Sequence, residues 1–457
     1  MTDTPRITMD AIAVEPRLMG LKYHIVTYGC QMNAHDSETI AGILERMGMT
    51  KAAEREDADL VMYNTCCVRE NAERRALGNV GWLKELKKVK PALMIGVCGC
   101  MVQQSGMAEK LIKRYPFVDL AFGTHNLHEL PAMLTGLLDG RQRVVNVTDT
   151  DGIIAEGMPV KRVSSLQAYV TIMYGCNNFC SYCIVPYVRG RERSREPGDI
   201  LREVEALKAD GVREIMLLGQ NVNSYAGGGM DFAGLLREVD EIGIERVRFM
   251  TSHPKDLSDR LIEVMAGSRH ICHQLHLPVQ HGSDRILEAM NRRYTRAHYL
   301  ELVGRLRAAM LDIGLTTDLI VGFPGETEED FAETLSLVRE VRYDSAYTFI
   351  YSPRQGTVAA DMPGQIDEDT ARRRIHELIA VQEGITAETY AAQVGRVEQV
   401  LVEGLSARSE KQATGRTGRG ITVNFPGGAE LIGRTVPLEI TGAGHNTLKG
   451  RLVSENG

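Results

Sequence analysis

The stretch YGCNNFCSYCIVP, residues 174–186, contains Cys176, Cys180 and Cys183 in a C-x3-C-x2-C spacing. Thiolates bind zinc, iron–sulfur clusters or copper. A structural zinc site has four protein ligands, whereas the surrounding region offers only one other cysteine, Cys272. Three thiolates can instead hold an iron–sulfur cube and leave one iron open. The spacing therefore predicts a cluster that binds a small molecule, with a zinc knuckle or three incidental thiols as the alternatives.

Around this stretch, short apolar runs alternate with helical patterns such as GDILREVEALKADG. Six of the runs are predicted strands: 168–174, 214–219, 246–252, 272–278, 316–322 and 345–351. Six β/α units predict a partial (β/α)6 barrel, which a long helix over about 367–392 closes. Functional residues then belong on the loops that follow the strands, and Cys176 lies on the first of them.

An earlier part of the chain has the same alternation. The runs 22–28, 59–65 and 92–97 resemble buried parallel strands, each followed by a helical pattern. They predict an open α/β sheet over residues 21–139. Ligand sites in such sheets gather at the carboxyl ends of the strands, and Cys30, Cys66 and Cys100 each follow one of these ends. A second three-thiolate site and unrelated buried thiols are both open interpretations.

Composition and the ends of the chain bear on its location and its division into domains. The 457 residues include 53 basic and 60 acidic side chains, for a net charge of −7, and nine cysteines. The beginning of the chain lacks a secretory signal pattern and no apolar run approaches ~20 residues, so we expect a cytoplasmic protein outside the membrane. Short β patterns near the end predict a small all-β barrel. The predicted divisions are a tail, an α/β domain, a linker, a barrel core and a β domain: 1–20, 21–139, 140–161, 162–392 and 393–457.

On the cysteine loop, the chain resembles the radical S-adenosylmethionine (SAM) enzymes. The resemblance implies a [4Fe–4S] cluster whose open iron binds the amino and carboxylate groups of SAM, and one-electron cleavage that releases a 5′-deoxyadenosyl radical. It also implies contacts to SAM from residues around the barrel mouth. These are Tyr182 beside the adenine, Gln220 and Asn221 in LLGQNV, and Gly322 and Gly325 in DLIVGFPGET.

The first region resembles the N-terminal domain of the methylthiotransferases, in TYGCQMNAHDSE, NTCCVREN and GCM. The resemblance implies a second [4Fe–4S] cluster held by Cys30, Cys66 and Cys100, with Cys67 and Cys98 as additional cysteines. LPVQHGSDRILEAMNRRYT and YSPRQGT are most similar to the group that acts on tRNA. This group adds a methylthio group to C2 of N6-dimethylallyladenosine at position 37, with SAM and an electron donor such as flavodoxin. A different tRNA base or a ribosomal protein side chain is the alternative substrate.

The C-terminal region resembles the TRAM domain, an RNA-binding module. Its basic stretch, residues 407–420, is predicted to be a loop, and salt-dependent phosphate contacts are one interpretation of it. The candidates are Arg408, Lys411, Arg416 and Arg419. A second basic run follows the cysteine loop and contains Arg189, Arg191, Arg193 and Arg195. These arginines either guide RNA phosphates or pair with Glu192 and Glu196. The sequence assigns no acid–base catalytic residue and no oligomeric state.

Overall fold

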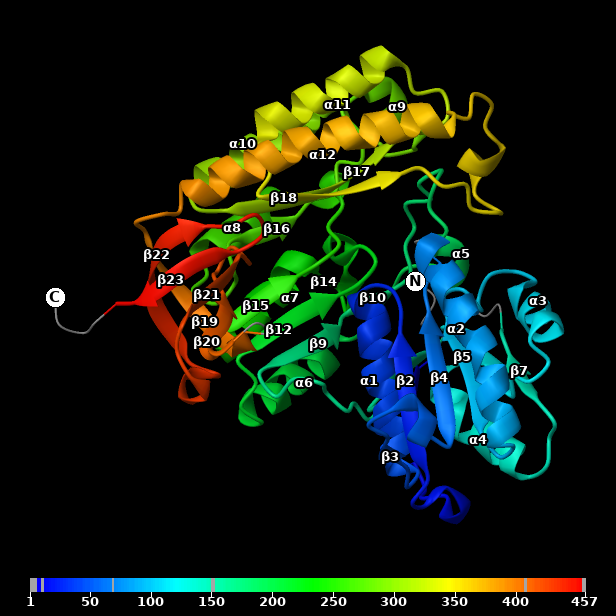
Figure 1. Cartoon of the computed structure of the whole chain (residues 1–457). Coiled ribbons are helices and arrows are strands. Elements are labelled where there is room, and N and C mark those ends of the chain that lie inside the picture. Colours follow the sequence, from blue (N-terminus) through cyan, green and yellow to red (C-terminus); the bar gives the residue numbers. More distant parts are fainter. Residues whose placement is uncertain (1–5, 10–11, 68–69, 149–152, 407–408, 454–457) are drawn as a thin grey trace.

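Three units follow one another in the computed structural model, over residues 22–146, 167–391 and 397–452. The structure describes residues 6–9, 12–67, 70–148, 153–406 and 409–453. In Figure 1 the first and third units lie on opposite sides of the central one. An α/β sheet, a set of six β/α units and a closed β-barrel confirm the predicted fold class.

The N-terminal unit is a parallel sheet with helices on both faces. Its strands lie in the order β3-β2-β4-β5-β6-β7. Helices α1 and α4 bury Ile43 and Leu134 on one face, and α2 and α3 bury Leu83 and Leu111 on the other. The elements are β2 (Lys22–Thr27), α1 (Gln31–Arg46), β3 (Thr50–Lys51), η2 (Arg55–Asp57), β4 (Leu60–Thr65), α2 (Glu70–Val89), β5 (Met94–Gly99), α3 (Met107–Arg114), β6 (Leu120–Phe122), η3 (Leu127–Glu129), α4 (Leu130–Leu138) and β7 (Val144–Asn146).

Segments on either side of the predicted first domain are also built into the structure. Strand β1 (Arg6–Thr8) pairs in parallel with β8 (Ile154–Glu156), as a two-stranded sheet separate from the six-stranded one. The 3-10 helix η1 (Pro16–Leu18) places Leu18 in the core, fully buried. Strand β7, in the stretch predicted as a linker, is the last strand of the sheet. These residues are apolar enough to add a strand and a core side chain, although their runs are too short to show periodicity.

The central unit contains the six predicted parallel strands. They form two three-stranded sheets, β15-β12-β9 and β16-β17-β18, joined by a single bridge between Val247 and Ile271. The strands are β9 (Gln167–Thr171), β12 (Glu214–Leu218), β15 (Arg246–Phe249), β16 (Gln274–His276), β17 (Gly314–Val321) and β18 (Ser345–Ile350). The helices are α5 (Val185–Arg189), α6 (Pro197–Ala209), α7 (Phe232–Ile242), α8 (Asp259–Gly267), α9 (Asp284–Ala289), α10 (Arg296–Ala309), α11 (Glu328–Val341) and α12 (Glu368–Ala391).

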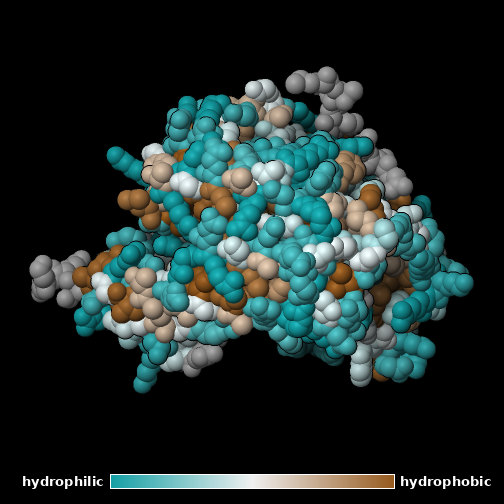
Figure 2. All heavy atoms as spheres, turned by 90° about the horizontal axis from the view of Figure 1, so that it is seen from above, coloured by the Kyte–Doolittle hydropathy of each residue, from teal (hydrophilic) through white to brown (hydrophobic). Residues whose placement is uncertain are grey.

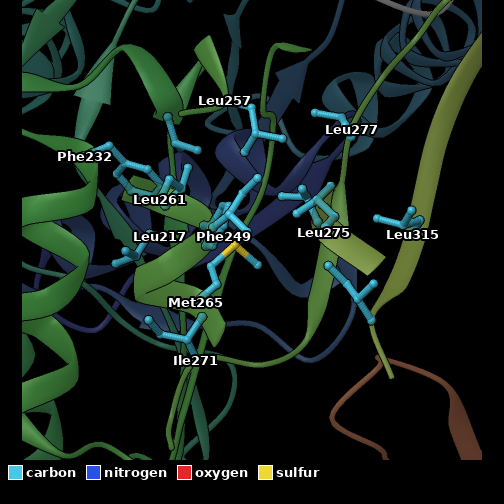
Figure 3. Packing of buried hydrophobic residues seen from close by; sticks show 14 of the residues in the cluster. Leu217, Phe232, Phe249, Leu257, Leu261, Met265, Ile271, Leu275, Leu277 and Leu315 are labelled. Carbon is cyan, nitrogen blue, oxygen red and sulfur yellow. The ribbon is translucent and has the colours of Figure 1, made fainter. Parts of the chain in front are cut away.

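Short elements complete this unit, and its interior is apolar. They are β10 (Met173–Tyr174), β11 (Arg193–Ser194), η4 (Val222–Ser224), β13 (Ala226–Gly227), β14 (Met230–Asp231), η5 (Pro254–Asp256) and η6 (Val358–Asp361). Figure 3 shows Leu217, Phe249 and Leu275 from three neighbouring strands meeting Met265 from α8. Burial of this surface at ~25 cal/mol per Å² holds the helices on the strands, so the strand ends are a rigid base for loops.

The C-terminal unit is a closed barrel of five strands in the order β19-β20-β21-β23-β22. Its elements are β19 (Val397–Ser406), β20 (Ser409–Arg416), β21 (Thr422–Pro426), η7 (Ala429–Leu431), β22 (Thr435–Ala443) and β23 (Leu448–Leu452). The turn between β20 and β21 lies against the amino ends of the central strands. There Arg246 donates hydrogen bonds to the carbonyl oxygens of Arg416 and Gln399, at 2.6 and 2.8 Å. The barrel therefore docks at the end of the central unit opposite to Cys176.

A buried ion pair fixes this docking. Arg248 lies 2.9 Å from Glu214, with both side chains 4% exposed, and donates to the carbonyl oxygen of Thr417 at 2.8 Å. We expect Arg248→Met to lower the free energy of unfolding by about 3–5 kcal/mol, because it leaves a buried carboxylate without its cation. The shift of the urea midpoint measures this. The matched control Arg213→Met breaks a more exposed pair with Glu245 and should cost under about 1 kcal/mol; equal losses would contradict the prediction.

In the part of the chain that the structure describes, no helix combines the length and apolar character needed to cross a bilayer. The face shown in Figure 2 is largely hydrophilic, with small hydrophobic areas scattered over it.

Candidate active site at two cysteine clusters

The loop that carries Cys176, Cys180 and Cys183 follows β9 and β10 at the end of the barrel. Gly175 begins it with a φ of +78°, and a Cβ there would lie 2.0 Å from the carbonyl oxygen of Arg191. Only glycine allows the two backbone segments to cross this closely. The side-chain oxygen of Gln220 accepts a hydrogen bond from the N–H of Gly175. Gln220 therefore supports the cysteine loop directly, and its predicted contact with SAM stays a prediction.

The end of helix α9 holds the middle of the same loop. The N–H of Ser181 donates to the carbonyl oxygen of Met290 at 3.0 Å, and its hydroxyl donates to that of Ala289 at 2.8 Å. The side-chain amide of Asn291 donates to the carbonyl oxygen of Phe179 at 2.9 Å. Contacts from a distant part of the chain thus determine the conformation of the cysteine loop.

A buried arginine lies beside the thiols. Arg292 is 4% exposed, and its Nη1 lies 3.4 Å from the Sγ of Cys180 while its Nη2 donates to the carbonyl oxygen of Pro278 at 2.7 Å. A fixed cation here stabilises thiolate ligands and the negative charge of a cluster. Arg292 lies in the stretch NRRYT, but the sequence does not single it out, because a lone arginine in a motif does not show which group it faces.

Burial controls the protonation of this loop. It raises the pKa of the Cys176 thiol to about 11 and that of Cys183 to about 12. Both groups are therefore neutral thiols at neutral pH until a metal binds and displaces their protons.

Buried polar atoms without partners surround the loop. Within the described residues, six such atoms near the carboxyl ends of β9, β12 and β15 have no hydrogen-bond partner: Asn178 Oδ1, Asn221 Oδ1, Asn223 Nδ2 and Oδ1, Ser252 Oγ and His253 Nε2. His253 Nδ1 accepts from the N–H of Lys255 at 3.2 Å, so its proton lies on Nε2 as a donor. Buried polar groups are normally satisfied. A ligand with both charged donors and acceptors, as SAM has, fits this set.

The other predicted SAM contacts lie at the same edge of the barrel. Asn221 follows β12 and donates to Asp256 at 2.7 Å. Gly322 and Gly325 follow β17, both with positive φ, and the N–H of Gly325 donates to the carbonyl oxygen of Gly364 at 2.8 Å. Tyr182 packs against an apolar cluster that includes Phe323. The structure brings these residues to one side, and their individual roles stay predictions.

The second group of cysteines lies at the carboxyl ends of three neighbouring strands. Cys30 follows β2, Cys66 follows β4 and Cys100 follows β5. Gly29, at φ +123°, is so close to Cys66 that a Cβ would lie 3.2 Å from its Sγ. A side chain at this position would push the two cysteines apart. The parallel sheet thus gathers the three predicted ligands at one edge.

A buried asparagine organises this group. The Oδ1 atom of Asn33 lies 3.6 Å from the Sγ of Cys30 and 3.9 Å from the Sγ of Cys100. Its Nδ2 donates to the carbonyl oxygen of Thr65 at 2.9 Å, next to Cys66. One side chain therefore contacts all three strand ends. The sequence analysis did not identify Asn33, because its position three residues after Cys30 has meaning only once helix α1 forms there.

The additional cysteines differ in their surroundings. Cys98 is buried in the sheet, as strand alternation predicts. Cys67 packs with Cys100 and with Ile184 and Val188 of the central unit. A hydrogen bond from the Cys67 thiol, with the charge of Arg189 nearby, lowers the pKa of Cys100 to about 6 against the effect of burial. Cys100 is thus prepared to act as a thiolate ligand.

Neither group has the geometry of a mononuclear metal site. Among the residues described, no three Cys, His, Asp or Glu side chains are grouped so that one ion could bind them all. A [4Fe–4S] cube makes a different demand, since each thiolate binds a different iron and the sulfurs stand farther apart. Three free cysteines on glycine-bounded loops, beside buried Arg292 in one case and buried Asn33 in the other, fit such clusters.

The arginines after the cysteine loop have their own partners. Arg189 and Arg193 are buried, where Arg189 pairs with Asp36 at 2.7 Å and Arg193 donates to the carbonyl oxygen of Arg189 at 3.3 Å. Arg191 lies over the ring of Phe179, 4.4 Å from its centroid, and is exposed. Of these three arginines, Arg191 is therefore the one on a surface that RNA could reach.

Two further partners of this run come from elsewhere in the chain. Arg195 binds Glu156 at 2.6 Å and Glu203 at 2.8 Å. Glu192 instead accepts from the N–H of Asn177 at 3.0 Å. The sequence left phosphate contacts and pairing with Glu192 and Glu196 equally open for these arginines, and the ion pairs of Arg195 with Glu156 and Glu203 match neither interpretation.

The basic stretch of the C-terminal unit is part of the barrel. Residues 409–416 form strand β20 in place of the predicted loop, since they pair with β19 and β21. Lys411 is exposed, and Arg416 is 44% exposed and 3.4 Å from Glu403. Arg419 pairs with Asp344 at 2.7 Å at the docking surface. Arg408 lies outside the described residues.

Each of the three units matches a known protein family. Residues 22–123 match the uncharacterized protein family UPF0004, residues 170–338 match the radical SAM superfamily and residues 391–453 match the TRAM domain. The radical SAM methyltransferase TsrM from Kitasatospora setae has a similar fold, with a TM-score of 0.55 and 17% identity over 75% of this chain and 77% of its own. Fold, cysteine loop and family match define a radical SAM enzyme, which binds SAM and a [4Fe–4S] cluster.

Curated relatives narrow the class. A tRNA-2-methylthio-N(6)-dimethylallyladenosine synthase of Carboxydothermus hydrogenoformans is 54% identical over 435 residues, which cover 94% of this chain and 99% of the relative. The synthase of the same name from Clostridium perfringens is 52% identical over 434 residues, covering 94% and 97%. The chain belongs to the family of tRNA-2-methylthio-N(6)-dimethylallyladenosine synthases.

Proposed function

We propose that the chain adds a methylthio group to C2 of the adenine in N6-dimethylallyladenosine, at position 37 of tRNA. The observation that carries the proposal is the presence of two separate three-cysteine sites, one at the mouth of the central barrel and one on the N-terminal sheet. An unactivated aromatic C–H bond has no acid–base route, so this chemistry needs cofactors. Two [4Fe–4S] clusters and SAM, when bound, supply the radical that removes hydrogen from C2 and the sulfur that replaces it.

The chain's own residues bind and position these groups. Cys176, Cys180 and Cys183 hold the first cluster, while Gln220 and the end of helix α9 hold the loop that carries them. The unpartnered atoms of Ser252 and His253 offer hydrogen bonds to a ligand in the mouth. In this proposal Cys30, Cys66 and Cys100 hold the second cluster.

The C-terminal barrel offers a second surface for RNA, apart from the mouth of the central barrel. The C-terminal barrel docks at the amino ends of the central strands, away from the cysteine loop. Exposed Lys411 and partly exposed Arg416 on this barrel are candidates for phosphate contacts, which would make binding depend on salt. A target base in a single-stranded loop can be turned out of its stack and enter the mouth. An electron donor such as flavodoxin, in the cytoplasm, completes the proposed system.

A reconstituted reaction tests the function. Anaerobic protein with reductant and SAM is given an anticodon stem-loop RNA that carries N6-dimethylallyladenosine. We expect the RNA to gain the mass of a methylthio group and 5′-deoxyadenosine to accumulate. A stem-loop with unmodified adenosine and a ribosomal protein substrate are the controls. Methylthiolation of the protein in preference to the RNA would replace the proposal with its alternative, and release of no 5′-deoxyadenosine would exclude both.

A further inference from the structure

Helix α5 lies between the two cysteine sites. It begins two residues after Cys183, so it continues the loop of the first site. Its Val188 packs with Cys67 and Cys100 of the second site. The hydroxyl of Thr124, in the N-terminal unit, donates to the carbonyl oxygen of Val188 at 2.6 Å. One short helix therefore belongs to the surroundings of both sites.

Arg189, the last residue of this helix, reaches into the N-terminal unit. Its side chain is 6% exposed, and its Nη2 donates to Asp36 at 2.7 Å and to the Oδ1 of Asn33 at 3.4 Å. That oxygen is the one that lies 3.6 Å from the Sγ of Cys30 and 3.9 Å from the Sγ of Cys100. The guanidinium is thus one side chain away from two predicted ligands of the second cluster.

We propose that Arg189 is a positioning residue for the second cluster, and that its charge and the opposing charge of Asp36 together set the reduction potential of that cluster. The inference rests on the proposed function, in which Cys30, Cys66 and Cys100 hold the cluster. A reduced cluster carries one more negative charge than an oxidised one. A nearby buried cation stabilises the reduced state and a nearby carboxylate opposes it, because charges interact strongly where water is excluded.

Two other roles for Arg189 predict different behaviour. A phosphate contact requires an exposed guanidinium, whereas this one is buried and its charge is matched by Asp36. A purely structural ion pair would hold the N-terminal and central units together without any effect on the cluster. Removing either partner of such a pair would loosen the structure in the same way. Opposite effects of the two removals are therefore the signature of electrostatic tuning.

The test measures the reduction potential of the second cluster alone. Full-length protein with Cys176, Cys180 and Cys183 changed to Ala is reconstituted with iron and sulfide, then titrated anaerobically and followed by electron paramagnetic resonance. We expect Arg189→Met to lower the potential and Asp36→Asn to raise it. Arg189→Lys keeps the charge on a side chain with a different head group, so its shift should be smaller than that of Arg189→Met.

Arg195 provides a matched control. It is buried in the same segment, pairs with Glu156 at 2.6 Å and donates to the carbonyl oxygen of Thr171 at 2.6 Å. Arg195→Met also removes a buried cation that joins the central unit to β8. We expect this variant to melt at a lower temperature but to leave the potential of the second cluster unchanged. A shift as large as that of Arg189→Met would overturn the inference.

The outcomes separate the inference from the function beneath it. If the protein without Cys176, Cys180 and Cys183 binds no cluster, the proposed function loses its second cluster and the inference falls with it. If the cluster forms but both substitutions shift its potential in the same direction, or neither does, only the role of Arg189 is overturned. Should Arg189→Met not fold, the double variant with Arg189→Met and Asp36→Leu replaces both charged side chains with apolar ones. The reduction potential of the second cluster in this double variant should lie below that in Asp36→Asn; an equal or higher value would contradict the inference.

Discussion

Replacing Cys176, Cys180 and Cys183 together with alanine should abolish both methylthiolated RNA and 5′-deoxyadenosine. The loop would then offer no thiolate for a cluster, and no side chain at the barrel mouth can substitute for one-electron chemistry. Iron should fall from about eight to about four per chain, since one of two cubes is lost. Anaerobic iron and sulfide counting, with chromatography of 5′-deoxyadenosine and mass spectrometry of the RNA, measures all three quantities.

Cys272 is the matched control for this experiment. It is a buried free thiol of the same unit, but it lies near Arg246 and Arg248 at the opposite end of the barrel. We expect Cys272→Ala to retain both clusters and both products. If the triple variant keeps about eight irons, or still releases 5′-deoxyadenosine, the three cysteines do not hold the cluster that cleaves SAM.

The framework of both sites could be predicted from sequence because it depends on local patterns. Buried parallel strands appear as apolar runs, and Cys30, Cys66, Cys100 and Cys176 each lie shortly after such a run. Neighbouring parallel strands end at one edge of their sheet, so Cys30, Cys66 and Cys100 had to come together once β2, β4 and β5 paired. The resemblance to a known family then identified which cysteines to expect as ligands.

The residues around the thiols could not be predicted in the same way. Arg292 reaches Cys180, and Arg189 reaches Asp36 and Asn33, only through packing between distant segments. In the run VRGRERSR, Arg189 looks no different from exposed Arg191. Its burial follows from the position of α5 against α1, for which the sequence has no local signal.

A similar limit applies to strand β20. Its sequence SEKQATGR contains one apolar side chain, Ala413, which is fully buried in the barrel. Alternation of apolar and polar residues, the usual sign of a strand, is therefore missing. Backbone pairing with β19 and β21 makes the segment a strand in spite of its polar composition, and the turn that follows it is used for docking.

Replacing Cys30, Cys66 and Cys100 together with alanine should separate the two halves of the reaction. We expect methylthiolated RNA to disappear while 5′-deoxyadenosine is still released. The first cysteine loop is held within the central unit, by Gln220, by the end of α9 and by Arg292. In the proposed reaction, loss of the second cluster therefore removes the sulfur donor and leaves the site of SAM cleavage intact. Both products are measured in one reaction, and iron should again fall to about four per chain.

The pattern of products decides what the second cluster does. If 5′-deoxyadenosine is lost along with the methylthio group, the second cluster delivers electrons to the first and is not merely the sulfur donor. Retained methylthiolation would show that these cysteines are dispensable. Cys98→Ala is the matched control, because Cys98 lies on β5, the strand that Cys100 follows, but is buried in the core of the sheet. It should keep both products, since removing a thiol from the apolar core changes packing and leaves the three strand-end thiolates in place.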